Sequence, residues 1–390
     1  MKPRHIVLIN IIFIGFMLFS AGMVYQFMTG KKPISIIKSW AHTTKATHVA
    51  TTTCSTQKAL NLRGATSAGL RKLSVYQDAC HSLATDTMMV FISMPDSNDA
   101  AVALAKEDAA TLKEFSTFHV RPVIIAEPST KGGTLLDFEL FANGTYTPAL
   151  QTYFTELKAQ GVTSQQMGIW TPFPEANLPY WDNNKPEFFA PAVNAYLTAL
   201  RAVFPDAQTS VMLNSATYDT SDFNWENGDY ASLLPYVKGI QPGLVNYAGI
   251  QGFPWMAKQG GNGSILNAAE FLNPDLLTEM ATALGTKKIW FNTGTFASKY
   301  TLDPAKVVTL TPERRKSILD TVFSQATALQ KDGYDVSINI FAQDKSKTAE
   351  ETNWSYWSGD KPFSSADAPV ITDFINRVVT SNMQLWLFDK

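Results

Sequence analysis

The stretch WTPFPEANLPYWD (residues 170–182) begins at the end of a short apolar run and continues into prolines, a carboxylate, an amide and aromatics. A short continuous apolar run is typical of a buried parallel strand, and prolines end a strand because they lack an N–H donor. Glu175 and Asn177 are therefore predicted just beyond a strand's carboxyl end, where α/β barrels carry their functional groups. Trp170 and Trp181 offer flat apolar faces that suit sugar rings. The alternative is a capped strand followed by an ordinary aromatic loop.

Strand-like and helix-like segments alternate on both sides of this stretch. The predicted strands cover residues 60–65, 88–94, 120–126, 167–170, 209–213, 244–250, 288–291 and 336–341. The predicted helices cover residues 99–115, 147–160, 188–204, 311–331 and 369–379. Such alternation is typical of a parallel sheet with crossover helices. Eight strands, each followed by polar or aromatic residues, predict an α/β fold of the (β/α)8 TIM-barrel class over residues 58–390, without a second domain.

The composition favours a folded domain over a disordered chain. Aromatic residues make up 12% of the chain and charged residues 17%, which argues against disorder. The net charge of −2 gives no electrostatic case for a nucleic-acid partner. The five histidines have no metal-ligand spacing, and P-loop, G-x-S-x-G and dinucleotide fingerprints are absent from the sequence. We therefore expect neither a metal nor a cofactor.

The N-terminal region predicts a membrane anchor. Residues 6–28 are almost entirely apolar, which is long enough for a helix that spans a bilayer. A secretory signal is the alternative, but its apolar region would be shorter and would end in an A-x-A-like site. We expect an uncleaved single-pass anchor over residues 1–29, with the barrel extracellular. Residues 30–57 are rich in Thr, Ser and Lys and predict a flexible stalk.

Both cysteines, Cys54 and Cys80, fall in the part of the chain predicted to be exported. Oxidation is allowed in that compartment, and an even number of cysteines is compatible with one disulfide. Two buried free thiols are the alternative, since sequence alone gives no Cα distance.

Several segments, in order, resemble glycoside hydrolase family 26, the β-mannanase and endo-β-glucanase barrels. The matching segments are PEAN at 174–177 with the aromatics at 180–181, the helix at 193–204 with the strand at 211–214, VNYAGIQGF at 245–253, and KKIWFNTG at 287–294. The family's counterparts include His-Glu-Met-Asn, a GIDGY strand and a KPI.I.ETG strand. The match spans about residues 85–345. The resemblance implies a barrel that acts on or binds a β-linked polysaccharide of the mannan or glucan type.

By this resemblance, Glu175 corresponds to the general acid/base and Asn177 to its companion amide. The family's nucleophilic Glu is replaced by Asn292, its GIDGY Asp by Gln251, and the His before the acid/base by Pro174. A retaining glycosidase needs two carboxylates about 5–5.5 Å apart. Because an amide is neutral and a far weaker nucleophile than a carboxylate, we expect the standard retaining mechanism to be absent.

Several functions remain open at this stage. Glu175 could serve as the acid of an inverting hydrolase, with its base among Glu127, Asp182 and Asp344, at a carboxyl separation of about 6.5–9.5 Å. Asn292 could orient a substrate acetamido group in substrate-assisted catalysis. The barrel could also be a catalytically inactive carbohydrate-binding pseudoenzyme, or a surface protein that recognises another cell. The candidate substrate-binding residues are Asn177, Trp181, Tyr247, Gln251, Trp255, Trp170, Glu127 and Asp344.

Overall fold

The computed structural model of the 390-residue chain describes residues 87–117, 121–177, 186–214, 232–252, 274–293, 299–300, 308–309 and 312–341, and near the C-terminus residues 370, 373–374, 377–378 and 380–388. The predicted anchor, the stalk, the strand expected at 60–65 and both cysteines lie outside the described residues. Within the described residues, no helix is both long enough and apolar enough to cross a membrane.

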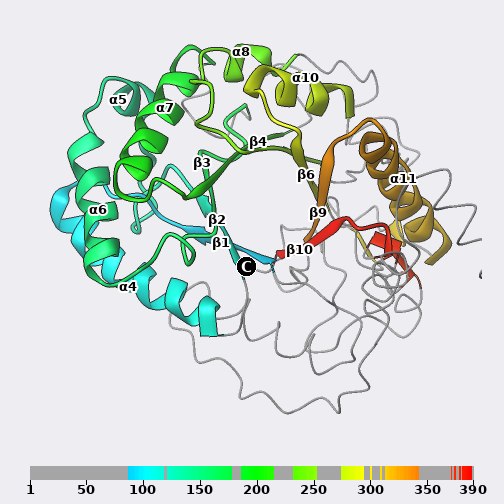
Figure 1. The fold of residues 1–390 in the computed structure, drawn as a ribbon, viewed down its shortest axis with the longest axis horizontal. Coiled ribbons are helices and arrows are strands. Elements are labelled where there is room, and N and C mark those ends of the chain that lie inside the picture. Colours follow the sequence, from blue (N-terminus) through cyan, green and yellow to red (C-terminus); the bar gives the residue numbers. More distant parts are fainter. Residues whose placement is uncertain are drawn as a thin grey trace, which may run out of the picture. The chain divides into compact units, whose positions relative to one another are not determined.

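Eight parallel strands close into a barrel (Figure 1). They are β1 (Thr87–Ile92), β2 (Arg121–Ala126), β3 (Ile169–Pro172), β4 (Gln208–Asn214), β5 (Tyr247–Gln251), β6 (Lys288–Thr293), β9 (Asp335–Phe341) and β10 (Gln384–Phe388). Their order around the barrel is β1-β10-β9-β6-β5-β4-β3-β2. The short strands β7 (Lys299–Tyr300) and β8 (Val308–Thr309) form a separate antiparallel pair. The TIM-barrel-like α/β fold predicted from the sequence is confirmed.

One strand differs from the prediction. The barrel is closed by β10 (Gln384–Phe388), which pairs with β1 on one side and with β9 on the other. No strand was predicted there, and the expected strand at 60–65 is not among the described residues. Each later strand is therefore one place earlier in the barrel than expected, and Glu175 follows the third barrel strand rather than the fourth.

The helices lie outside the ring of strands (Figure 1). They are α4 (Asn98–Thr117), α5 (Phe138–Ala142), α6 (Thr147–Ala159), α7 (Pro186–Val203), α8 (Leu234–Val237), α10 (Pro274–Leu284) and α11 (Pro312–Lys331). Their boundaries follow local chemistry. For example, α6 ends just before Gly161, whose φ of 82° is a conformation that glycine adopts without steric cost.

Side chains alternate between the two faces of each barrel strand, as the pleat requires. Ile169 points into the barrel, where it packs with Met212 and Trp290. Trp170, the next residue, belongs to the larger core between the strands and the helices. Both faces of the barrel wall are thus buried, and this explains why its strands read as continuous apolar runs.

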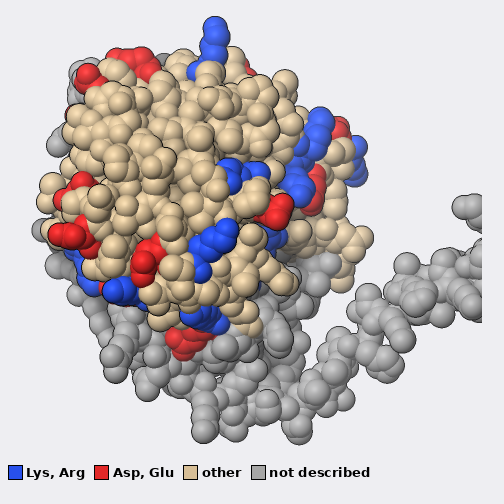
Figure 2. All heavy atoms as spheres, turned by 60° about the vertical axis from the view of Figure 1, so that its left-hand side comes forward, with Lys and Arg blue, Asp and Glu red and all other residues tan. Residues whose placement is uncertain are grey.

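The outer face over α4 to α7 carries charges of both signs. Figure 2 shows lysine and arginine side chains interspersed with aspartate and glutamate on this face, with broad uncharged areas between them. An interspersed pattern of this kind supplies no single-sign field over the face shown.

Candidate functional site

Glu175 is held at the carboxyl end of the barrel by a strained turn after β3. Phe173 and Glu175 both have a φ of 53°, a left-handed conformation that is uncommon for residues other than glycine. The backbone N–H of Phe173 donates to Ala126 O at the end of β2 (3.0 Å), and that of Glu175 donates to Met212 O on β4 (3.1 Å). The turn is therefore tied to both strands that flank β3.

Aromatic packing holds the same turn in place. The ring of Phe173 is fully buried and makes edge-on contacts with Phe138 (5.0 Å between centroids), Phe141 (4.8 Å) and Tyr196 (5.7 Å). Two left-handed residues cost of order 1–3 kcal/mol each, and such strain persists where the surroundings over-determine it. Strained positions of this kind cluster at functional sites, so this turn is the first reason to locate a site at Glu175.

Two amide side chains donate to one oxygen of Glu175. Asn214 Nδ2 donates to Glu175 Oε1 at 2.8 Å, and Gln251 Nε2 donates to the same oxygen. Asn214 is itself fixed by Asn177, because Asn177 Oδ1 accepts its backbone N–H (2.8 Å) and Asn177 Nδ2 donates to its carbonyl (2.8 Å). Asn177 is only 2% exposed, so the structure places it behind Asn214 as a support.

Four carboxamides lie in register on neighbouring strands, and we call them the amide row. Asn214 on β4 pairs with Gln251 on β5, Gln251 with Asn292 on β6, and Asn292 with Asn339 on β9. Asn292 Nδ2 donates to Gln251 Oε1, and Asn339 Nδ2 donates to Asn292 Oδ1 at 2.6 Å. Asn214 and Asn339 were not predicted as site residues. The sequence signal for each is a single Asn in a mostly apolar strand, as in VMLN at 211–214 and SINI at 337–340.

A second row of side chains forms the floor beneath the amides. Met212, Gly249, Trp290 and Ser337 occupy successive register positions on the same four strands. Trp290 is fully buried, and its indole N–H donates to Ser210 Oγ at 2.8 Å. The indole takes the space that the absent side chain of Gly249 leaves, since an added Cβ would lie closer than 3.0 Å to its atoms.

Two aromatic candidates do not lie at this site, and their predicted contact with a substrate is corrected. Trp170 is 0% exposed and packs against Phe154 (5.4 Å between centroids) on the helix side of β3. Tyr247 lies four residues before Gln251, about 13 Å along the strand at about 3.3 Å per residue. It is buried in the barrel interior beside Lys288, whose Nζ lies 5.1 Å from the ring centroid.

The remaining candidates divide into described and undescribed positions. Glu127 follows β2 at the same end of the barrel, is half-buried, and donates its backbone N–H to Ile92 O (3.0 Å). Trp181, Asp182, Trp255 and Asp344 lie outside the described residues.

Asn292 occupies the place where the resemblance requires a nucleophile. It is 2% exposed, its carbonyl oxygen accepts from Asn339, and its amide nitrogen donates to Gln251. The second carboxylate of a retaining glycosidase is therefore not supplied by this position. Among the described residues, no group of three or more His, Cys, Asp or Glu side chains could hold a metal ion.

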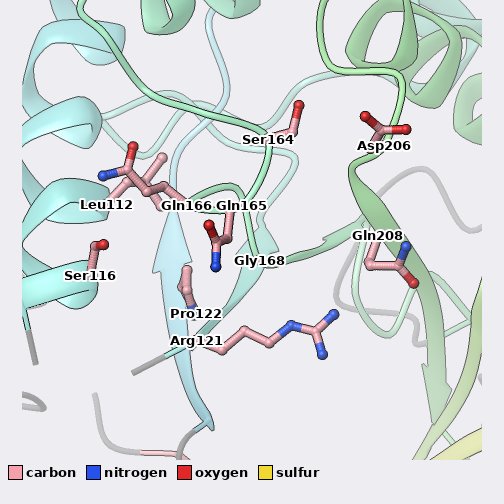
Figure 3. Close-up of a pocket in the computed structure, with 10 residues that line it drawn as sticks. All are labelled: Leu112, Ser116, Arg121, Pro122, Ser164, Gln165, Gln166, Gly168, Asp206 and Gln208. Atoms are coloured by element: carbon pink, nitrogen blue, oxygen red, sulfur yellow. The ribbon is translucent and has the colours of Figure 1, made fainter. Parts of the chain in front are cut away.

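A separate hollow of about 730 Å³ lies at the opposite end of the barrel (Figure 3). Its lining includes Arg121 and Gln208, the first residues of β2 and β4, and Gly168, just before β3. Because all the barrel strands are parallel, this hollow is at the amino ends of the strands, away from the amide row. TIM-barrel chemistry is found at the carboxyl ends, so the hollow is not part of the candidate site.

A partly buried acid on α4 lies between the barrel and its helices. Burial raises the pKa of the Asp108 carboxyl on α4 to about 7, although the hydrogen bond from Tyr153 Oη (2.7 Å) lowers it. Burial also raises the pKa of Tyr153 well above its usual value. The pair joins α4 to α6 on the helix side of the wall, so it belongs to the packing of the barrel and not to the amide row.

Comparisons with known proteins give structural likenesses at low identity. No protein-family model matches the chain, and no curated protein matches it. A family 1 β-glucosidase from Thermotoga maritima is 11% identical, with a TM-score of 0.47 over 75% of this chain and 82% of its own. The β-glycosidase BGL167 is 13% identical, with a TM-score of 0.47 over 75% of this chain and 82% of its own. The barrel itself is shown by the order and pairing of its strands.

Proposed function

We propose that this chain is a family 26-like barrel that binds a neutral β-linked polysaccharide, of the mannan or glucan type, at the carboxyl end of its strands. The observation that carries the proposal is the arrangement around Glu175, in which one carboxylate oxygen accepts from two carboxamides and Asn292 continues the row where a second carboxylate is required. Among the described residues, the site has polar groups that can recognise a ligand, and position 292 does not supply the second carboxylate of the retaining mechanism.

The chemistry of the site is suited to recognition of hydroxyl groups. A carboxylate accepts from sugar hydroxyls, and carboxamides both donate and accept, so a fixed set of these groups matches the donors and acceptors of a pyranose. We propose that Trp181 and Trp255, which follow β3 and β5 in the sequence, add flat apolar faces on which the rings stack. A polyuronate would bring its own negative charge towards Glu175, which disfavours acidic glycans.

An inverting hydrolase is the second candidate, and one observation favours it. Glu127 and Glu175 follow β2 and β3, which are neighbours in the barrel and pair up to Ala126 and Pro172. Neighbouring strands are about 4.8 Å apart, so carboxyls on the two following turns can reach the separation of about 6.5–9.5 Å that inversion requires. In this mechanism one of them protonates the leaving oxygen and the other activates a water.

The rest of the chain fits a cell-surface location under this proposal. We propose from the sequence alone that residues 6–28 are an uncleaved anchor, that residues 30–57 are a stalk, and that the barrel lies outside the cell. Full-length protein in the membrane fraction supports the anchor, whereas a soluble product that begins near residue 21–25 contradicts it.

The test of function uses the full-length protein in detergent and a panel of oligosaccharides. Mannohexaose and cellohexaose are titrated by calorimetry as neutral ligands. Oligogalacturonate is the acidic comparison, and chitohexaose is the comparison that carries acetamido groups. Glu175→Gln is expected to weaken binding of the neutral oligomers at least tenfold, because hydrogen bonds to a charged group are worth about 1.5–3 kcal/mol. Glu139→Gln, the same change at an exposed position on α5, is expected to bind as the wild type does.

Release of reducing ends separates the two candidates. No release from the neutral oligomers supports the binding protein, and release that is lost in both Glu127→Gln and Glu175→Gln supports the inverting hydrolase. Release from chitohexaose alone supports substrate-assisted catalysis through Asn292. Failure of every oligomer to bind refutes the glycan proposal.

A further inference from the structure

Three carboxamides of the amide row, those of Asn339, Asn292 and Gln251, all point in one direction. Asn339 Nδ2 donates to Asn292 Oδ1 (2.6 Å), and Asn292 Nδ2 donates to Gln251 Oε1. Gln251 Nε2 then donates to Glu175 Oε1. Each amide gives an N–H to the next residue, and the final acceptor is the carboxylate.

The carboxylate determines this direction. An ionised carboxyl group only accepts hydrogen bonds, whereas a carboxamide has one end that donates and one that accepts. Glu175 therefore fixes which end of Gln251 faces it, and the outward end of Gln251 fixes Asn292 in turn. Reversing any one amide would bring two donors or two acceptors face to face inside the barrel, where an unmade hydrogen bond is costly.

We infer that Gln251, Asn292 and Asn339 are positioning residues that keep Glu175 Oε1 a permanent hydrogen-bond acceptor, so that a proton on this carboxyl group is carried by Oε2. Asn214 Nδ2 makes the second donation to Oε1 (2.8 Å). An oxygen that receives two N–H donors is not the one that is protonated, because a proton on it would oppose a donor.

This inference assigns Asn292 a role that differs from that of a substituted nucleophile. Its amide nitrogen and its carbonyl oxygen both form hydrogen bonds within the row, and its side chain is buried. Asn292 is a link between Gln251 and Asn339 and does not touch the glycan. Only the effect on glycan binding rests on the proposed function, since the direction of the row is set without any ligand.

The orientation of the row is tested by NMR on the full-length protein with ¹⁵N-labelled Asn and Gln side chains and no ligand. Glu175→Gln replaces an obligate acceptor with a group that presents either end, so the row loses its fixed direction. The side-chain amide resonances of Asn339, which does not contact Glu175, are expected to shift or split. In an Asn292→Leu background the same Glu175→Gln change should leave Asn339 unmoved and still alter Gln251.

Two results would overturn the inference. One is that the side-chain amide resonances of Asn339 do not change in Glu175→Gln. The other is that they shift by the same amount in Glu175→Gln whether residue 292 is Asn or Leu. Asn292→Ala serves if Asn292→Leu does not fold. Alanine is smaller than leucine and also removes both hydrogen bonds of the link, so here too Glu175→Gln is expected to leave the Asn339 resonances unchanged.

The positioning role is tested by binding. Gln251→Leu is expected to weaken the mannohexaose or cellohexaose complex at least about tenfold, through loss of a donor to the charged group. Gln208→Leu makes the same change at the opposite end of the barrel and should leave affinity unchanged. If the wild type binds a glycan and Gln251→Leu binds equally well, the positioning role is wrong. If no glycan binds the wild type, the proposed function fails, while the NMR result still decides the direction of the row.

Discussion

Gly249→Ala is expected to destabilise the barrel from its interior. A Cβ at this position would lie closer than 3.0 Å to Cε2, Nε1 and Cζ2 of Trp290. The indole is fully buried, and its N–H donates to Ser210 Oγ at 2.8 Å. Overpacking a core costs about 1–3 kcal/mol, and loss of the indole hydrogen bond adds about 1 kcal/mol. The expected loss in unfolding free energy is about 2–4 kcal/mol, a large share of a total stability of about 5–15 kcal/mol.

Urea unfolding followed by circular dichroism measures this loss. Gly132→Ala is the matched control, because Gly132 is exposed and its added Cβ would meet only Thr130 Oγ1, at an ordinary 3.7 Å. The control should stay within about 0.5 kcal/mol of the wild type. Trp290→Phe removes part of the clashing ring system, so it should recover at least about 1 kcal/mol of the Gly249→Ala cost in a double-mutant cycle. A Gly249→Ala protein as stable as the control would refute the packing argument.

Three further predictions follow from the charges, the buried amides and the cysteines. The pKa of Asp108 is about 7 in the folded protein and 3.8, its usual value, in the unfolded chain. Between these two pH values the folded protein holds a proton that the unfolded chain has lost, so the free energy of unfolding falls as the pH rises. Asp108→Asn should flatten that fall in urea titrations between pH 5 and 7, and an unchanged slope would contradict it. Asn292→Glu places a charge and an extra methylene at a position that is 2% exposed. We therefore expect the free energy of unfolding, measured with urea, to fall by at least about 2 kcal/mol. We also expect no glycan hydrolysis, measured by the release of reducing ends. Cys54 and Cys80 are expected to form a disulfide worth about 3 kcal/mol; two alkylatable thiols in the unreduced, denatured protein would exclude it.

The positions of most barrel strands could be predicted because a wall buried on both faces leaves a local signal. The run before Glu175 and the run ending at Asn214 are short, apolar and followed by polar residues, and both form strands. The run at 384–388 carries the same signal. It was not predicted because the run at 60–65 was expected to be one of the eight strands that a TIM barrel needs. Which strand closes a barrel depends on pairing between distant segments and not on local sequence pattern.

The direction in which each side chain points could not be predicted from the same signal. When both faces of a strand are apolar, the pattern does not say which one is inside, so Trp170 was expected at the ligand face and lies under the helices. Tyr247 was a candidate substrate-binding residue, but it is the first residue of β5 and therefore lies away from the carboxyl end of the barrel. The amide row depends on register across four strands, which a one-residue slip would destroy.

The amide row also explains why one carboxylate, rather than two, is compatible with this barrel interior. Gln251 can offer its N–H to only one side, and it offers it to Glu175. A carboxylate at 292 would face Gln251 Oε1 and place acceptor against acceptor, and its charge would lie in the same row as that of Glu175. Asn292 avoids both conflicts, because it donates to Gln251 and accepts from Asn339. Within the described residues, the acceptor that this arrangement leaves without a partner is Asn339 Oδ1, at the far end of the row. The identity of the residue at 292 and the direction of the whole row are thus one property, determined by the charge on Glu175.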